Sequence, residues 1–315
     1  MRSLIFCLFF FSSQFAFAQN EITVLHANGK VMYTADGSSK ATQIFPGDPV
    51  SAKGSIQCQA NSSVKLLCKG KTFEFNDTRS HGLTDEVLKK AGDGSSLSFT
   101  NRFWNFLTTS MEGSEDEHKL EEHHHESMEK THAGVKGYAT GDFAMGVNVV
   151  YIHNFGEGLV QFKWDQIETN QYCFVLTRQS DDGEVARIWT SNNSLHLNLE
   201  DLPLKNDAAY EWQVFSAEPG KEVPSTPKIL FSYQPETLKK TLERTKGLRA
   251  YQDASDLEKA LMEAFTLEEA GFYYSAANAY QHMDRKFEGN MLVRRAKASF
   301  LARIDQLDEA KALIN

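Results

Sequence analysis

Residues 261–280 read LMEAFTLEEAGFYYSAANAY, and residues 295–314 read RAKASFLARIDQLDEAKALI. Six positions of the first stretch correspond to positions 34 residues later in the second: Ala264 and Ala298, Leu267 and Leu301, Gly271 and Asp305, Tyr273 and Leu307, Ala276 and Ala310, Tyr280 and Ile314. Such a period is typical of paired helices that stack through small residues. Ser255 and Glu258 form a capping box that predicts where the first helix begins.

This repeat resembles the tetratricopeptide repeat, although Asp305 stands where the family has glycine at the turn. The resemblance implies a helical tail over residues 236–315. In this family a concave helical face takes a peptide or a partner helix, so we expect a protein partner to bind there. Tyr273, Tyr274 and Tyr280 are candidate contacts, and Tyr273 and Tyr280 also occupy positions suited to helix packing.

Short alternating segments separated by turn residues predict an all-β module over residues 19–80. Its order of motifs resembles the periplasmic FecR-like domain: GKV at 29–31, IFPGDPV at 44–50, Ile56, and NSSVKL at 61–66. The regulators that name this family carry an anti-sigma segment and a membrane helix, and neither is recognisable here, so a sigma-factor pathway is not implied.

Three cysteines follow the first eighteen residues. Cys58 and Cys68 flank a predicted hairpin around Asn61-Ser62 and are candidates for a disulfide. Cys173 lies in a predicted strand, where a half-buried thiol is the simplest interpretation.

Residues 136–235 predict a second β-unit, because aromatic residues alternate along several short segments. Three inward sets are expected to form the core of a two-sheet sandwich: Phe162 and Trp164; Tyr172, Phe174 and Leu176; Tyr210, Trp212 and Val214. The pattern resembles a fibronectin type III-like domain, which indicates a fold and not a function. Trp189 is left open as a core residue or as part of a surface that binds a partner or a carbohydrate.

The first eighteen residues have the features of a signal peptide: Arg2, an apolar run, and Ala16-Phe17-Ala18 as a cleavage site. We therefore expect an exported protein of the bacterial envelope, periplasmic or on the cell surface, without a transmembrane helix in the mature chain. The net charge of −9 and the lack of a basic stripe argue against nucleic acid as a partner.

Residues 81–135 are predicted to be a helical, acidic connector, in which residues 97–111 pack on the β-module. The stretch EGSEDEHKLEEHHHESMEK covers residues 112–130. If it is helical, one stripe carries five potential ligands for Zn²⁺ or Cu²⁺: His118, Glu122, His125, Glu129 and His132. We favour the other interpretation, a solvated linker whose histidines hold no metal, and keep metal binding as the alternative.

The sequence contains no recognisable catalytic pattern. HESME at residues 125–129 lacks the second histidine that a zincin needs. We expect a multidomain β plus α protein that is not an enzyme, needs no cofactor, and acts in the envelope by binding another protein. The alternatives are a metal-binding protein that uses residues 112–132 and a module that binds cell-wall carbohydrate.

Overall fold

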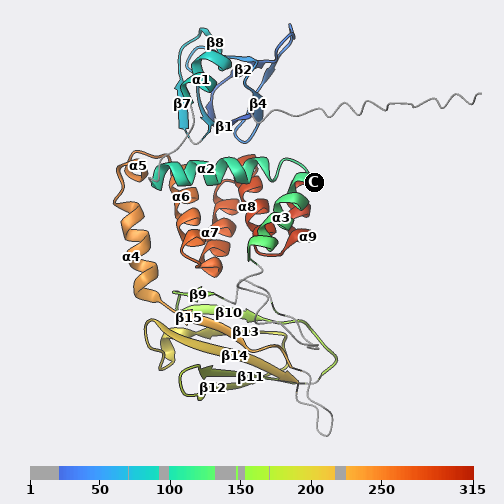
Figure 1. Ribbon diagram of the computed structural model, residues 1–315, viewed down its shortest axis with the longest axis vertical. Helices are drawn as coiled ribbons and strands as arrows, with labels where there is room; N and C mark the ends of the chain where they lie inside the picture. The colour runs from blue at the N-terminus through green and yellow to red at the C-terminus, as the bar shows by residue number, and fades with distance from the viewer. Residues whose placement is uncertain are drawn as a thin grey trace, which may run out of the picture.

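The computed structural model describes residues 21–69, 71–91, 99–131, 147, 153–169, 171–216 and 225–315. Two β-units lie at opposite ends of the molecule, and a layer of helices separates them (Figure 1). The mixed β plus α class predicted from the sequence is confirmed. The predicted signal peptide, residues 1–18, lies outside the described residues.

The N-terminal β-unit has two four-stranded sheets, ordered β4-β1-β6-β7 and β3-β2-β5-β8. Its strands are β1 (Glu21–Asn28), β2 (Val31–Thr34), β3 (Ala41–Gln43), β4 (Pro49–Ser51), β5 (Ser55–Cys58), β6 (Ser63–Cys68), β7 (Lys71–Phe75) and β8 (Ser80–Gly82). Alternate residues such as Ile22, Val24, Val64 and Leu66 are buried, so the sheets share one apolar core. A π-helical turn (Thr84–Leu88) and α1 (Lys89–Ala91) follow.

The predicted hairpin between Cys58 and Cys68 is wrong, because β5 and β6 belong to different sheets. Asn61 has a φ of 58°, and its turn carries the chain from one sheet to the other. The turn packs on residues 28–30, where the Lys30 N–H donates to Ser62 Oγ at 2.9 Å. Both cysteines are free buried thiols, and burial raises the pKa of each.

The second β-unit is a sandwich of a two-stranded sheet, β10-β13, and a five-stranded sheet, β12-β11-β14-β15-β9. Its strands are β9 (Asn154–Phe155), β10 (Leu159–Lys163), β11 (Tyr172–Arg178), β12 (Gly183–Thr190), β13 (Ser194–Asn198), β14 (Ala208–Ser216) and β15 (Ile229–Tyr233), with a 3₁₀ turn at Leu199–Asp201. The predicted core residues are confirmed: Phe162, Trp164, Tyr172, Phe174, Leu176, Tyr210, Trp212 and Val214 are all buried.

The helical layer is built from two separate parts of the chain. The first part is α2 (Phe99–Glu112) and α3 (Glu117–Thr131), and the second is α4 (Pro235–Lys246), α5 (Arg249–Gln252), α6 (Asp256–Glu269), α7 (Tyr273–Lys286), α8 (Met291–Arg303) and α9 (Leu307–Ile314). The predicted capping box at Ser255 and Glu258 is present at the start of α6. Gly271 and Asp305, related by the 34-residue period, both have positive φ, 75° and 61°. Aspartate tolerates this conformation better than most residues, so the turn survives the loss of glycine.

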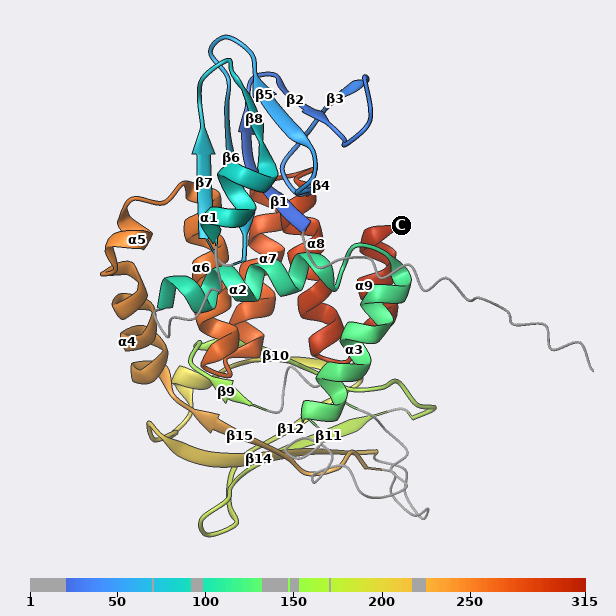
Figure 2. The same ribbon diagram turned by 45° about the horizontal axis from the view of Figure 1, so that its top comes forward.

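Helix α2 crosses α6 and α8 and contributes its aromatic side to their core (Figures 1 and 2). The rings of Phe99, Phe103 and Phe106 lie 5.6, 5.8 and 4.8 Å from the Phe265 ring of α6. Leu107 and Met111 are also buried there. The prediction that residues 97–111 pack on the β-module is therefore only partly right, because α2 touches β6 but packs mainly on helices that come far later in the sequence.

The N-terminal β-unit is attached to this layer by charged groups of two helices. Lys65 Nζ on β6 lies 2.6 Å from Glu258 Oε1 at the start of α6. Arg295 of α8 is buried and donates to the carbonyl oxygens of Gly47 and Ser114 at 2.8 and 3.2 Å. These contacts hold the β3–β4 turn and the α2–α3 turn on the same helix.

We predict that Leu107→Ala lowers the free energy of unfolding by about 2–5 kcal/mol, because it leaves a cavity between α2 and the later helices. Thr109→Ala is the matched control on the same helix, since Thr109 is exposed. Urea denaturation of both variants checks this. Equal stability of the two variants would show that α2 is not part of the core.

Candidate functional site

The outward face of the five-stranded sheet carries an apolar strip that the fold does not cover completely. Tyr172, Phe174 and Leu176 point into the sandwich, so the intervening residues of β11 point outward. The strand register places Cys173 beside Trp189 of β12 and Phe215 of β14, and Val175 beside Arg187 and Gln213. We call these six residues the outer sheet face.

Trp189 dominates the outer sheet face, with 53% of its surface exposed. Cys173 and Val175 beneath it are buried, although they belong to the outward side of the sheet. Arg187 lies over Cys173, with Nη1 3.6 Å from Sγ, and its guanidinium also contacts Glu184 at 2.6 Å. The face therefore offers an exposed indole bordered by one balanced ion pair, an arrangement that suits an apolar group or a flat ring.

The strand that carries Trp189 lies at the edge of its sheet. Among the strands that the structure describes, β12 pairs only with β11. An open edge leaves backbone N–H and C=O groups available to an extended peptide. The indole and the open edge thus lie on the same strand.

The three tyrosines predicted to contact a partner make contacts within the chain. Tyr280 is buried, its hydroxyl donates to Glu268 Oε1 at 2.7 Å, and its ring stacks on Phe300 at 4.9 Å. Tyr274 accepts the N–H of Gln161 on β10 at 3.0 Å. Tyr273 packs on the ring of His153 at 4.6 Å. Tyr273 and Tyr274 therefore fix α7 to the sandwich, and of the four predicted contact residues Trp189 is the exposed one.

A buried polar network beneath α2 was not foreseen from the sequence. The Arg303 guanidinium donates to both carboxylate oxygens of Glu268, at 3.0 and 3.1 Å, and to the hydroxyls of Ser110 and Ser299 at 3.1 and 2.6 Å. Its carbon Cζ lies 4.6 Å from the centre of the Phe106 ring. Burial raises the pKa of the Glu268 carboxyl, which Arg303 opposes, and burial together with the Glu268 charge raises the pKa of Tyr280 well above its usual value. The network joins α2, α6, α7 and α8.

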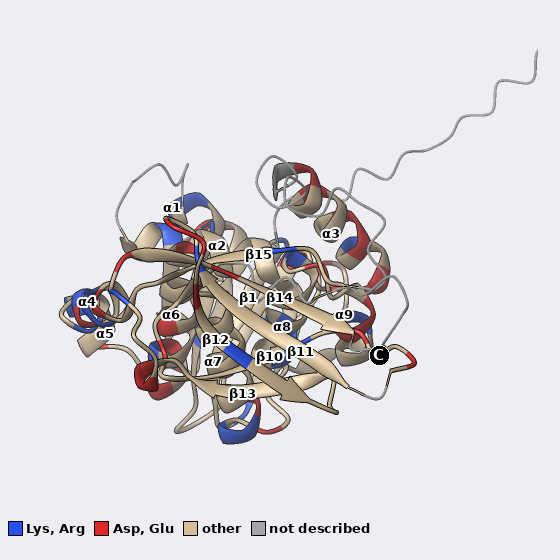
Figure 3. Ribbon diagram, turned by 90° about the horizontal axis from the view of Figure 1, so that it is seen from below, with Lys and Arg blue, Asp and Glu red and all other residues tan. Residues whose placement is uncertain are grey.

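The predicted metal-binding stripe lies on the exposed side of α3 and separates into two pairs. His118 Nδ1 is 3.4 Å from Glu122 Oε1, and His125 Nε2 is 3.3 Å from Glu129 Oε1. His132 lies outside the described residues. Within the described parts of the chain, no three or more His, Cys, Asp or Glu side chains are placed to hold one metal ion. Figure 3 shows the acidic residues that lie along this helix.

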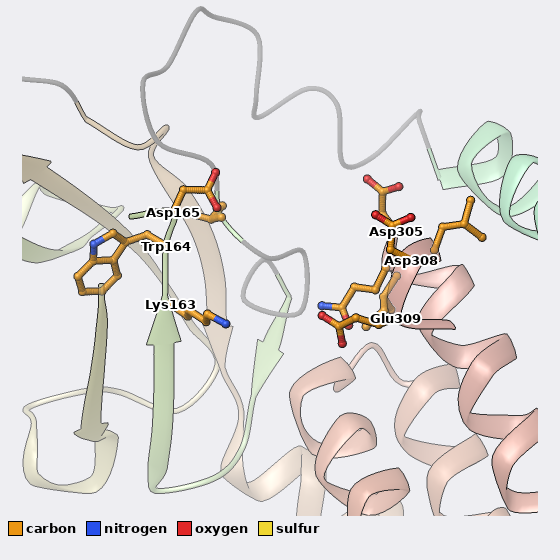
Figure 4. Close-up of a pocket in the computed structure, with 10 residues that line it drawn as sticks. Lys163, Trp164, Asp165, Asp305, Asp308 and Glu309 are labelled. Carbon is orange, nitrogen blue, oxygen red and sulfur yellow. The ribbon is translucent and has the colours of Figure 1, made fainter. Parts of the chain in front are cut away.

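An acidic pocket of about 380 Å³ lies between the end of β10 and the α8–α9 turn (Figure 4). The indole of Trp164 points away from it into the sandwich, whereas Asp305, Asp308 and Glu309 come from the opposite wall. The pocket is lined by Val147, Lys163, Trp164, Asp165, Ile304, Asp305, Gln306, Leu307, Asp308 and Glu309. Four carboxylates against one lysine give it a negative potential, which favours cations.

Comparison with known proteins leaves the family open. No family model matches this chain, and no curated protein matches it. One solved structure with detectable similarity is astrotactin-2, described as a conserved vertebrate-specific and perforin-like membrane protein involved in neuronal development. It is 9% identical, with a TM-score of 0.19, over 51% of this chain and 35% of that chain. In the described part of this chain, no helix is both long and apolar enough to span a membrane.

We predict that Arg303→Ala lowers the free energy of unfolding by about 3–5 kcal/mol, because it leaves the Glu268 carboxylate buried without its partner. Arg249→Ala removes an ion pair whose side chains are 93% and 70% exposed, so its loss is expected to change stability by less than about 1 kcal/mol. Thermal and urea unfolding of both variants provide the comparison. A similar loss of unfolding free energy in Arg303→Ala and Arg249→Ala would contradict the structural role given to Arg303.

Proposed function

We propose that this chain is an exported, non-catalytic protein of the bacterial envelope that acts by binding another protein. The signal-peptide pattern at residues 1–18 supports export. The two helical hairpins related by 34 residues support the resemblance to tetratricopeptide repeats, and the two-sheet arrangement of residues 154–233 supports the resemblance to a fibronectin type III-like domain. The motifs of residues 29–66 support a FecR-like module. These three resemblances are to modules that bind other molecules and not to enzymes.

We place the partner-binding surface on the sandwich and not on the helical tail. One side of α6 and α8 packs against α2, α8 and α9 contact α3, and α7 contacts the sandwich. In a tetratricopeptide protein such faces would be open to a ligand, whereas here the chain itself fills them. The outer sheet face remains, with Trp189 half exposed on an edge strand.

The exposure of Trp189 is the observation that carries this proposal. A large aromatic residue is a common anchor of protein interfaces, because it buries a wide apolar area with little loss of side-chain freedom. Cys173 and Val175 beneath it are already buried, so Trp189 supplies most of the apolar area of this face that is open to a partner. The open edge of β12 would let an extended segment add main-chain hydrogen bonds.

We predict that Trp189→Ala lowers recovery of the envelope partner about tenfold or more, because an interface anchor contributes about 2 kcal/mol or more. The measurement is a quantitative pull-down from envelope extract with the full chain as bait. Leu159→Ala is the matched control, since Leu159 is 63% exposed but lies on β10 of the other sheet.

The two variants separate the proposal from its alternatives. Equal recovery by wild type and Trp189→Ala would remove the outer sheet face as the binding surface. Retention of wild type, but not of Trp189→Ala, on purified cell wall without a protein partner would instead support the carbohydrate-binding alternative. Saturable sub-micromolar Zn²⁺ binding, lost when His118 and His125 are changed to Ala, would support the metal-binding alternative.

A further inference from the structure

The edge strand β12 is regular over only part of its length. Glu184 and Ala186 pair with consecutive residues of β11, so Val185 between them forms a β-bulge. The regular part of the strand is therefore residues 186–190, and Ile188 is its middle residue. The opposite edge of this sheet, β9, contacts α7, whereas β12 lies on the side of the sheet away from the helical layer (Figure 1). The helical layer thus leaves room for a further strand beside β12.

Both faces of β12 carry apolar side chains that the described strands cover only in part. On the outward face Trp189 is 53% exposed. On the inward face Ile188 is half-buried, although Phe174 and Leu176, the inward residues of the neighbouring strand β11, are completely buried. A strand added to this edge would cover more of Ile188 and Trp189 at once. The pattern indicates an occupant that continues the sheet, and not one that rests on a single face.

The residue types along this strand are complementary to themselves. When two copies of a strand pair antiparallel about a two-fold axis perpendicular to the sheet, side chains of the same face lie opposite each other and one residue lies on the axis. With Ile188 on the axis, Trp189 of each copy lies opposite Arg187 of the other. An axis at Arg187 would place two guanidinium groups opposite each other, and an axis at Trp189 would place Arg187 opposite Ser191, beyond the end of the strand. The register centred on the regular part of β12 is therefore the one that brings cation and indole together.

We propose that β12 pairs with β12 of a second copy of this chain, antiparallel and with Ile188 on the two-fold axis. Each Trp189 then makes a cation–π contact with Arg187 of the other copy, so the contact arises twice by symmetry. Arg187 keeps its ion pair with Glu184, because Nε and Nη2 at the edge of the guanidinium make that contact and the plane of the group can stack on an indole. The inference rests on the proposed function, since it names one partner of the surface that contains Trp189. The two outer sheet faces would join into one continuous surface.

Sedimentation velocity of the chain from Gln19 onward tests for the dimer. Because a short strand edge buries a small interface, we expect a micromolar dissociation constant, so that most chains are paired at about 100 µM. Arg187→Ala is expected to weaken the dimer about tenfold or more, because both cation–π contacts are lost. Arg249→Ala is the matched control, since it removes another exposed arginine with an ion pair to a nearby carboxylate and should leave the dimer unchanged. A wild-type chain that stays monomeric at this concentration would overturn the proposal.

Disulfide cross-linking tests the register. In Ile188→Cys the new thiol lies on the two-fold axis, opposite its own copy, at a Cα separation of about 4.5–5.5 Å that a disulfide can bridge. We therefore expect a covalent dimer to form rapidly under mild oxidation, whereas the wild type should form none, because its three cysteines after residue 18 are buried. Leu159→Cys is the control for random collision, since Leu159 is 63% exposed on β10. Cross-linking of Ile188→Cys no faster than that of Leu159→Cys would refute the register.

The outcomes separate this inference from the proposed function. A monomeric chain that recovers an envelope partner through Trp189 would remove the second copy as the occupant and leave the proposed function intact. A dimer cross-linked at residue 188, with equal recovery of the envelope partner by wild type and Trp189→Ala, would keep the inference and remove the proposed partner surface. Cross-linking of Ile188→Cys to a different protein of the extract, without a covalent dimer, would assign the edge to that protein and refute the second copy.

Discussion

The packing of α2 against α6 and α8 is the contact on which the whole arrangement depends. The helices of residues 235–314 would otherwise expose the apolar rings and small side chains that their repeat places on one side. The aromatic side of α2 covers them, and the Arg303–Glu268 pair lies beneath that cover, where a charge without its partner would be costly. The two β-units then attach to opposite sides of a finished helical layer.

Because α2 covers one side of the later helices, that side cannot be the surface that binds a partner. A repeat of this kind is usually taken to present a binding face, but a face that already holds a helix of its own chain is part of the core. The candidate tyrosines agree with this interpretation, because Tyr280 bonds to Glu268 and Tyr274 to Gln161. Trp189, by contrast, is exposed on an edge strand of the sandwich.

Local patterns in the sequence predicted local structure well. The period of 34 residues located both helical hairpins, the capping box located the start of α6, and alternation located the aromatic core of the sandwich. No comparable sequence pattern indicates which distant segments contact each other. His123 and Arg303 are 180 residues apart, and nothing in the spacing of either residue indicates the other. The same holds for Cys58 and Cys68, whose strands are neighbours in sequence but join different sheets.

In the sequence, the strands of the sandwich come after α2 and α3 and before α4 to α9, so they separate the two parts of the chain that form the helical layer. Helix α2 is therefore synthesised well before the helices that cover its aromatic side, and it must wait for α8, which ends at Arg303. Because such long-range closure is slow and leaves apolar surface exposed meanwhile, newly made chains would be especially vulnerable to aggregation and proteolysis until the last helices have folded. That partly folded intermediate, with the aromatic side of α2 still uncovered, is the species that a holdase chaperone would bind.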